Sequence, residues 1–222
     1  MGTMIVLNST DGHALGAYRA WPDEQPLAGI LVIQEIFGVN AHIRDICDRF
    51  AAEGYAAIAP ALFDRVKPGI ELDYDEAGIE RGRAVRKLVS WRDALTDLSA
   101  GLDALRPIGP VGAVGFCWGG SLAWLTASRL RPNCAVGYYG GQIAHFAEEV
   151  PRCPVMLHFG GKDTSIPMAD IDAIRKVRPE VTVHQYLDAG HGFNCDRRAS
   201  FHADAAALSW QRTLEFLAET LG

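Results

Sequence analysis

The chain has 222 residues, 49% of them hydrophobic and 22% charged, and this balance predicts one globular domain over residues 1–222. Its formal net charge is −6 and it has no run of Lys and Arg, which argues against a nucleic-acid partner. No apolar run approaches the length of a membrane span, so we expect no membrane partner either.

Short apolar runs alternate with longer amphipathic stretches, the pattern of strands alternating with helices. In chain order we expect an antiparallel sheet edge within the first twenty residues, strand 29–33, helix 43–52 capped by Asn40, strand 56–59 ending at Pro60, helix 79–105 in one piece or two, strand 111–115, helix 121–130, strands 135–138 and 155–159, helix 171–177, strand 181–186 and helix 203–221. This order predicts the α/β class, with a mostly parallel sheet covered by helices on both faces.

Residues 60–75 form the longest stretch without a regular pattern. One interpretation is a surface loop. The other is a lid or a pocket wall, because long loops in compact domains often carry function. The sequence favours neither.

The strongest motif is Gly115-Phe116-Cys117-Trp118-Gly119, between an expected strand and an expected helix. It has the G-x-C-x-G form of a nucleophile elbow, with Cys in place of Ser. The turn admits only small residues beside the nucleophile, whose backbone is strained. The sulfur would lie at a helix N-terminus, where the dipole favours thiolate and main-chain N–H groups can hold an oxyanion. The alternative is a small buried Cys in a tight turn.

A candidate acid and a candidate base follow later strands. Asp163 comes just after strand 155–159, and His191 follows strand 181–186 between two glycines. The order Cys, Asp, His is that of α/β-hydrolase triads, and active sites of such sheets lie at the carboxyl ends of the strands. His191 would take the thiol proton while Asp163 orients the imidazole. Taken singly, Asp163 could be a turn residue and His191 a solvent-facing one.

The other histidines and cysteines receive structural interpretations. We expect His13, His145 and His202 at the surface, His42 at a helix start, and His158 and His184 within strands. Five widely spaced cysteines without a C-x-x-C pair favour free thiols in a reducing compartment. The first residues lack the features of a signal peptide, so we expect a cytoplasmic protein. No His or Cys pair has the usual ligand spacing, and no metal is expected.

The sequence resembles the dienelactone hydrolase (carboxymethylenebutenolidase) family over most of its length. The matching segments are Gln34–Gly38, Gly115–Gly120, Tyr138–Gly140, Gly160–Asp163 and Ala189–Phe193. The resemblance implies the α/β-hydrolase fold and the hydrolysis of an ester or lactone. It also implies that Glu35 contacts the Cys117 thiol until substrate shifts it, and that the oxyanion hole is formed by the N–H groups of Ile36 and Trp118. The alternative for Glu35 is an ion pair with an arginine or a cap on the following helix.

The family's lactone hydrolases hold a substrate carboxylate with two arginines. The first falls on Arg81 or Arg83, and counting from His191 puts Cys195 at the second position, with Arg197 and Arg198 close by. We therefore predict a preference for substrates that carry a carboxylate, weaker than that of a two-arginine site.

The sequence thus predicts hydrolysis of a small-molecule ester or lactone through a thioester on Cys117, without a cofactor. The leading alternative is a broad carboxylesterase acting on uncharged esters. A non-catalytic binding protein on the same fold is less favoured because the Cys, Asp and His set is complete. A redox sensor is least favoured because no resolving Cys is visible in the sequence. Oligomeric state stays open.

Overall fold

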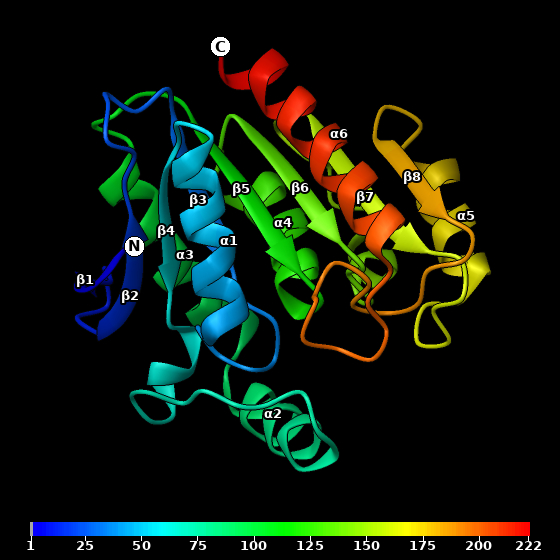
Figure 1. The fold of residues 1–222 in the computed structure, drawn as a ribbon, viewed down its shortest axis with the longest axis horizontal. Helices are drawn as coiled ribbons and strands as arrows, with labels where there is room; N and C mark the ends of the chain where they lie inside the picture. The colour runs from blue at the N-terminus through cyan, green and yellow to red at the C-terminus, as the bar shows by residue number, and fades with distance from the viewer. Residues whose placement is uncertain (1) are drawn as a thin grey trace.

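The computed structural model describes residues 2–222. Within them, strands form one sheet in the order β1-β2-β4-β3-β5-β6-β7-β8 (Figure 1). The strands are β1 Thr3–Asn8, β2 Ala14–Ala20, β3 Gly29–Ile33, β4 Ala56–Pro60, β5 Val111–Phe116, β6 Cys134–Tyr138, β7 Val155–Gly160 and β8 Thr182–Tyr186. Strands β3 to β8 pair in parallel, while β2 runs antiparallel to both β1 and β4. The expected parallel sheet with an antiparallel N-terminal edge is confirmed.

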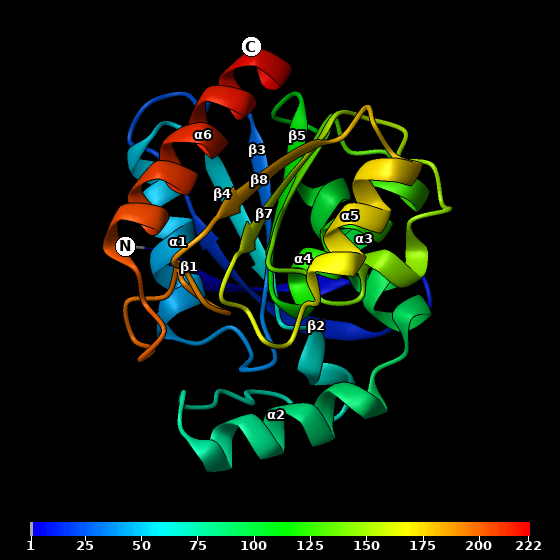
Figure 2. The same cartoon turned by 90° about the vertical axis from the view of Figure 1, so that its right-hand side faces the viewer.

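Helices cover both faces of this sheet. The helices are α1 Ala41–Ala52, α2 Glu76–Leu88, α3 Trp91–Leu105, α4 Trp118–Arg129, α5 Met168–Val177 and α6 Ala203–Leu221, with short 3-10 turns η1 Leu62–Arg65 and η2 Ile143–Phe146. Figure 2 shows α1 and α6 on one face and α3, α4 and α5 on the other, with α2 set apart below them. The α/β class is therefore confirmed. No helix in residues 2–222 is long and apolar enough to cross a membrane.

The expected helix 79–105 consists of two helices, α2 and α3. Val89 has an extended backbone, and the Ser90 side chain caps α3 by accepting a 3.0 Å hydrogen bond from the N–H of Asp93. The expected cap of α1 is confirmed, since Asn40 accepts from the N–H of Ile43 at 3.3 Å. Helix α4 begins at Trp118, three residues before its expected start. Its first turn contains two glycines, which are poor helix formers and hide the start in the sequence.

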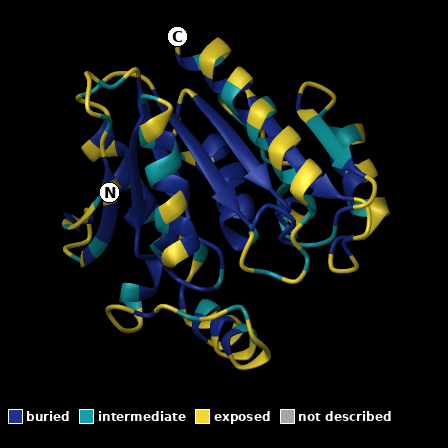
Figure 3. Ribbon diagram, viewed as in Figure 1, coloured by how far each residue is buried: buried dark blue, intermediate teal, exposed yellow. Residues whose placement is uncertain are grey.

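The central strands and α4 form the buried interior of the molecule (Figure 3). Every residue of β3, β5 and β6 is buried, and so is every residue of α4 from Trp118 to Ser128. A close-packed strand, turn and helix of this kind moves little. The turn from β5 into α4, which contains Cys117, is therefore held firmly from both sides.

The histidines outside the predicted triad lie largely where the sequence suggests. His42 is a buried residue at the start of α1, His158 and His184 lie in β7 and β8, and His145 is exposed. The expectation of surface positions is only partly right for His13 and His202, which are half-buried. The His202 side chain accepts from the N–H of Ala205 and caps α6, which draws it against the protein.

Candidate active site

Cys117 lies in the tight turn between β5 and α4. Its backbone has φ 54° and ψ −115°. This conformation with a positive φ is strained for any residue other than glycine. A Cβ on Gly115 would come within 1.9 Å of the carbonyl oxygen of Gly119, and a Cβ on Gly119 within 2.3 Å of that of Ile33. Both glycines of the motif are thus required by backbone packing, as the elbow interpretation predicts.

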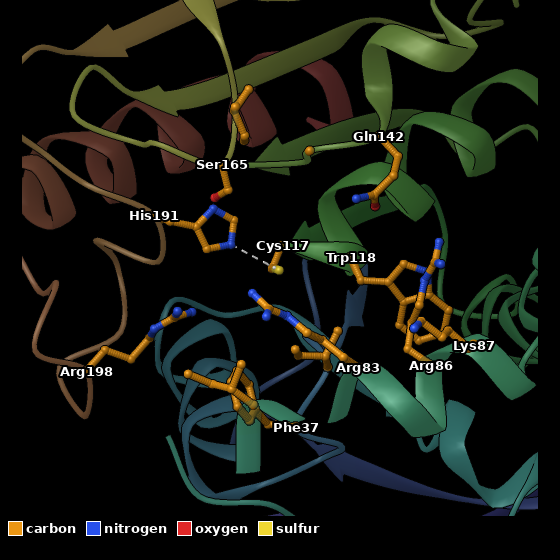
Figure 4. A pocket seen from close by; sticks show the side chains of 14 residues that line it. Phe37, Arg83, Arg86, Lys87, Cys117, Trp118, Gln142, Ser165, His191 and Arg198 are labelled. Atoms are coloured by element: carbon orange, nitrogen blue, oxygen red, sulfur yellow. Dashed lines mark hydrogen bonds between the residues drawn. The ribbon is translucent and has the colours of Figure 1, made fainter. Parts of the chain in front are cut away.

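The Cys117, His191 and Asp163 side chains form one series of hydrogen bonds, of which Figure 4 shows the contact between His191 and Cys117. His191 Nε2 lies 3.1 Å from Cys117 Sγ, and His191 Nδ1 lies 2.7 Å from Asp163 Oδ2. Ser165 donates to the other Asp163 oxygen from its N–H at 2.9 Å and from its hydroxyl at 2.6 Å. The carboxylate is therefore fixed by Ser165 and can in turn fix the imidazole, with Nε2 directed at the sulfur.

The hydrogen-bonded side chains shift the pKa values of one another. Burial acts to lower the pKa of the His191 imidazole, but Cys117 and Asp163 beside it outweigh burial and raise that pKa to about 10. Burial acts to raise the pKa of Asp163, but hydrogen bonds from His191 and Ser165 outweigh it and hold the pKa below its usual value. These directions favour the ionised Asp163 carboxylate and the charged form of the His191 imidazole beside it.

The main-chain N–H groups of Ile36 and Trp118 are available as hydrogen-bond donors for an oxyanion. Both residues line the pocket that contains Cys117. In residues 2–222, neither N–H donates a hydrogen bond to another main-chain or side-chain acceptor. Trp118 is the first residue of α4, so its N–H belongs to the helix terminus that attracts negative charge.

Glu35 is buried directly after β3 and is held by two partners. The Tyr74 hydroxyl donates to Oε2 at 2.8 Å, and Arg198 Nη1 donates to Oε1 at 3.2 Å. No hydrogen bond joins Glu35 to Cys117 within the described residues, so the expected contact with the thiol is not observed. The alternative interpretation, a pair with an arginine, is the one observed, because Arg198 supplies a partly buried positive charge beside the carboxylate.

A pocket of about 330 Å³ opens over Cys117 and His191. Its apolar wall includes Ile36, Phe37, Ile79, Trp118 and Ile166. Of the four arginines suggested by the sequence, Arg83 and Arg198 line this pocket, whereas the exposed Arg81 does not and Arg197 borders a separate hollow beside α1.

Sequence reasoning missed two cationic residues of the pocket wall, Arg86 and Lys87. They follow Arg83 by three and four positions, a spacing that puts all three side chains on one face of a helix. That spacing was a usable signal. The sequence could not show that this face of α2 turns toward Cys117.

Residues 60–75 contribute no lining residue to this pocket within the described chain. They support the site from behind, because Tyr74 holds Glu35 and the Phe63 ring stacks on Trp118 with centroids 5.8 Å apart. The wall that the sequence suggested for this segment is provided instead by α2, which follows it.

Within residues 2–222, one group of side chains has the spacing of metal ligands. One ligand atom from each of Glu35, His42 and Cys195 lies within 4.8 Å of the others. The Glu35 carboxylate is already balanced by Arg198, and burial raises the pKa of the Cys195 thiol to about 11, so this thiol stays protonated at neutral pH. These properties do not fit a metal centre, which needs deprotonated ligands.

Comparison with known proteins gives one consistent result. The sequence model of the dienelactone hydrolase family matches residues 15–221. A putative carboxymethylenebutenolidase of Synechocystis sp. is 42% identical over 82% of both chains, and the carboxymethylenebutenolidase of Pseudomonas putida is 37% identical over 96% of this chain and 95% of its own. The crystal structure of a putative dienelactone hydrolase from Klebsiella pneumoniae superposes with a TM-score of 0.84 at 31% identity, covering 97% of this chain and 99% of that one.

Proposed function

We propose, from the premise that this chain belongs to the dienelactone hydrolase family, that Cys117, His191 and Asp163 are its catalytic triad. The chain has the α/β-hydrolase fold and is a hydrolase of esters or lactones. The observation that carries the proposal is the contact of 3.1 Å between Cys117 Sγ and His191 Nε2, backed by the 2.7 Å contact between His191 Nδ1 and Asp163.

In the acylation step, the Cys117 thiolate attacks the carbonyl carbon of the substrate, and a C–S bond forms. The carbonyl oxygen takes the negative charge and accepts hydrogen bonds from the N–H groups of Ile36 and Trp118. The intermediate then expels the alkoxide, and the C–O bond of the ester breaks. The proton on His191 Nε2 goes to the departing oxygen, and a thioester remains on Cys117.

In the deacylation step, His191 Nε2 takes a proton from a water molecule as its oxygen attacks the thioester carbon. The C–S bond breaks, the sulfur leaves as thiolate, and the carboxylic acid is released. Asp163 keeps the imidazole oriented and stabilises its charged form throughout. The sum of both steps is one ester and one water converted into one acid and one alcohol, with no cofactor.

Glu35 has a separate part in this proposal. Because Tyr74 and Arg198 hold its carboxylate, it does not compete with His191 for the Cys117 proton. We assign it the role of a buried counter-charge that fixes Arg198 at the pocket wall.

The thioester can be tested directly. The protein is mixed with a 4-nitrophenyl ester, quenched in acid within the first turnover and digested. Peptide mass spectrometry is expected to find the acyl group on Cys117, with accumulation increased in His191→Ala if this variant still acylates. An acyl group on another side chain, or none with a rapid release of 4-nitrophenol, would exclude the mechanism.

A further inference from the structure

Gln142 directly precedes η2, in the segment after β6, and its side chain lines the pocket over Cys117. It is tied to Ser121, a fully buried residue in the first turn of α4. The main-chain N–H of Gln142 donates to the Ser121 hydroxyl oxygen at 3.0 Å, and this hydroxyl donates to Gln142 Oε1 at 3.2 Å. The side-chain amide is therefore anchored to the helix that begins beside the nucleophile.

These two hydrogen bonds determine which end of the amide faces the pocket. The Ser121 oxygen already accepts from the Gln142 main chain, and a hydroxyl has one hydrogen to donate. That hydrogen finds an acceptor only when Oε1 faces Ser121, so Nε2 must point away from it. Figure 4 shows the Gln142 nitrogen on the side nearer Cys117.

The Nε2 group of Gln142 is a donor without an assigned acceptor. Within residues 2–222 it donates to no side chain or main-chain carbonyl, and it is not among the enclosed polar atoms, so it is open to the pocket. Its surroundings are apolar, because the Trp118 side chain lies below it in Figure 4 and a Cβ on the neighbouring Gly141 would contact Ile166 at 3.7 Å. An uncharged donor on an apolar wall suits an uncharged oxygen, which costs little to desolvate.

The position of Gln142 indicates which part of a substrate it meets. The departing oxygen takes its proton from His191 Nε2, so the leaving group lies on the His191 side of Cys117. Figure 4 shows His191 on one side of Cys117 and Gln142, with Trp118, on the other. A substrate held in this orientation directs its acyl part along Trp118 and past Gln142.

We propose that Gln142 Nε2 donates a hydrogen bond to an uncharged oxygen in the acyl part of the substrate. The inference rests on the proposed function and narrows it: the preferred substrates are esters or lactones whose acyl chain carries an ether or hydroxyl oxygen near the carbonyl. Ser121 is a positioning residue, because it orders the amide before substrate arrives and so lowers the entropic cost of binding.

The kinetic test compares esters in which one chain atom of the acyl group is either oxygen or carbon. The pairs are 4-nitrophenyl methoxyacetate with 4-nitrophenyl butyrate, and 4-nitrophenyl 3-methoxypropanoate with 4-nitrophenyl pentanoate. We expect Gln142→Leu to lower kcat/KM about fivefold for the ether ester that presents its oxygen to Nε2, the range for one neutral hydrogen bond. The alkyl esters should change less than about twofold. Each ester is compared between wild type and variant, so the intrinsic reactivity of the ether esters cancels.

Two variants control for other effects of the substitution. Gln211→Leu makes the same change at an exposed position of α6, outside the pocket, and should alter no ester. Ser121→Ala leaves the amide in place but frees it to rotate, so a selective loss of about twofold on the ether ester is expected. Circular dichroism checks folding, and Gln142→Met replaces Gln142→Leu if the latter does not fold. Equal losses on ether and alkyl esters in the Gln142 variant, or no loss on either ether ester, would overturn the proposal.

A further pair checks the orientation of the substrate. Here the extra oxygen lies in the leaving group, in 2-methoxyethyl butyrate against butyl butyrate, with acid release followed by titration. Gln142→Leu should change both less than about twofold, and a selective loss confined to this pair would reject the acyl-side contact. The triad is tested separately: if Cys117→Ala still hydrolyses esters with the same dependence on Gln142, the nucleophile is wrong and the Gln142 contact stands.

Discussion

Arg198 donates to the carboxylate of Glu35 at 3.2 Å, joining two residues 163 positions apart in a pair whose carboxylate is fully buried and whose guanidinium is partly buried. The Cζ atom of the Arg198 guanidinium also lies 5.7 Å from the centroid of the Phe37 ring and 5.6 Å from that of the Tyr74 ring. The guanidinium thus ties the segment after His191 to the segment after β3. It lines the pocket that contains the nucleophile (Figure 4).

We expect Arg198→Gln to destabilise the protein by about 3–5 kcal/mol, because it leaves the Glu35 charge buried without its partner. The double variant Glu35→Gln/Arg198→Gln removes both charges and should recover part of this loss. Urea unfolding of the wild type, both single variants and the double variant measures the coupling between the two residues. Strictly additive losses would mean that the pair does not act as a unit.

Cys117→Ala should abolish ester hydrolysis and leave the fold intact, because the smaller side chain fits the same turn. Steady-state kinetics with a 4-nitrophenyl ester and a circular dichroism spectrum check the two halves of this expectation. Cys153→Ala is the matched control, since this half-buried thiol lies in the segment before β7. A folded Cys117→Ala protein with most of the wild-type kcat would exclude the thioester mechanism.

His191→Ala should lose several orders of magnitude in kcat, because the members of a triad act as a unit. Asp163→Asn should lose less, since Asp163 orients the imidazole and does not itself transfer the proton. Because Asp163 also accepts from Ser165, Ser165→Ala should give a smaller loss still. Wild-type kinetics in Asp163→Asn would show that another group holds His191.

Stability should fall with rising pH above neutrality through His191. Burial opposes the charge on this imidazole, yet Cys117 and Asp163 raise its pKa from 6.5 to about 10. The folded protein therefore keeps a proton that the unfolded chain releases. The resulting stabilisation is complete below pH 6.5 and is lost as the pH rises through about 10. Urea unfolding across this window should give a steeper decline for the wild type than for His191→Gln; parallel curves would contradict the raised pKa.

Gly119→Ala should cost about 3 kcal/mol or more, or prevent folding, because its new methyl group would lie 2.3 Å from the carbonyl oxygen of Ile33 and 2.5 Å from that of Gln34. Backbone atoms of a buried strand cannot move aside. Gly141→Ala is the matched control, since its methyl group would meet Ile166 at an ordinary 3.7 Å. Thermal unfolding compares them, and similar melting temperatures would argue against the packing requirement of the elbow.

Much of the fold was determined by local sequence pattern. Buried parallel strands are continuous apolar runs, so β3, β5 and β7 stand out, and the G-x-C-x-G spacing marks the turn that only glycines permit. The order of Cys117, Asp163 and His191, each after its own strand, was sufficient to predict that they meet at the carboxyl ends of the sheet. The break between α2 and α3 and the early start of α4 depended on caps and packing, which periodicity alone does not reveal.

Only the tertiary structure decided the partners of Glu35 and the composition of the pocket wall. Sequence allowed Glu35 to contact the thiol or an arginine, and the choice of Arg198 follows from how the segment after His191 folds back over β3. Likewise, the helical spacing of Arg83, Arg86 and Lys87 was present in the sequence. The direction in which these side chains point depends on how α2 packs against the rest of the protein. Gly82 permits that docking, because a Cβ there would come within 2.2 Å of the carbonyl oxygen of Ile36. Local pattern determines which residues share a face, whereas long-range packing determines what that face meets.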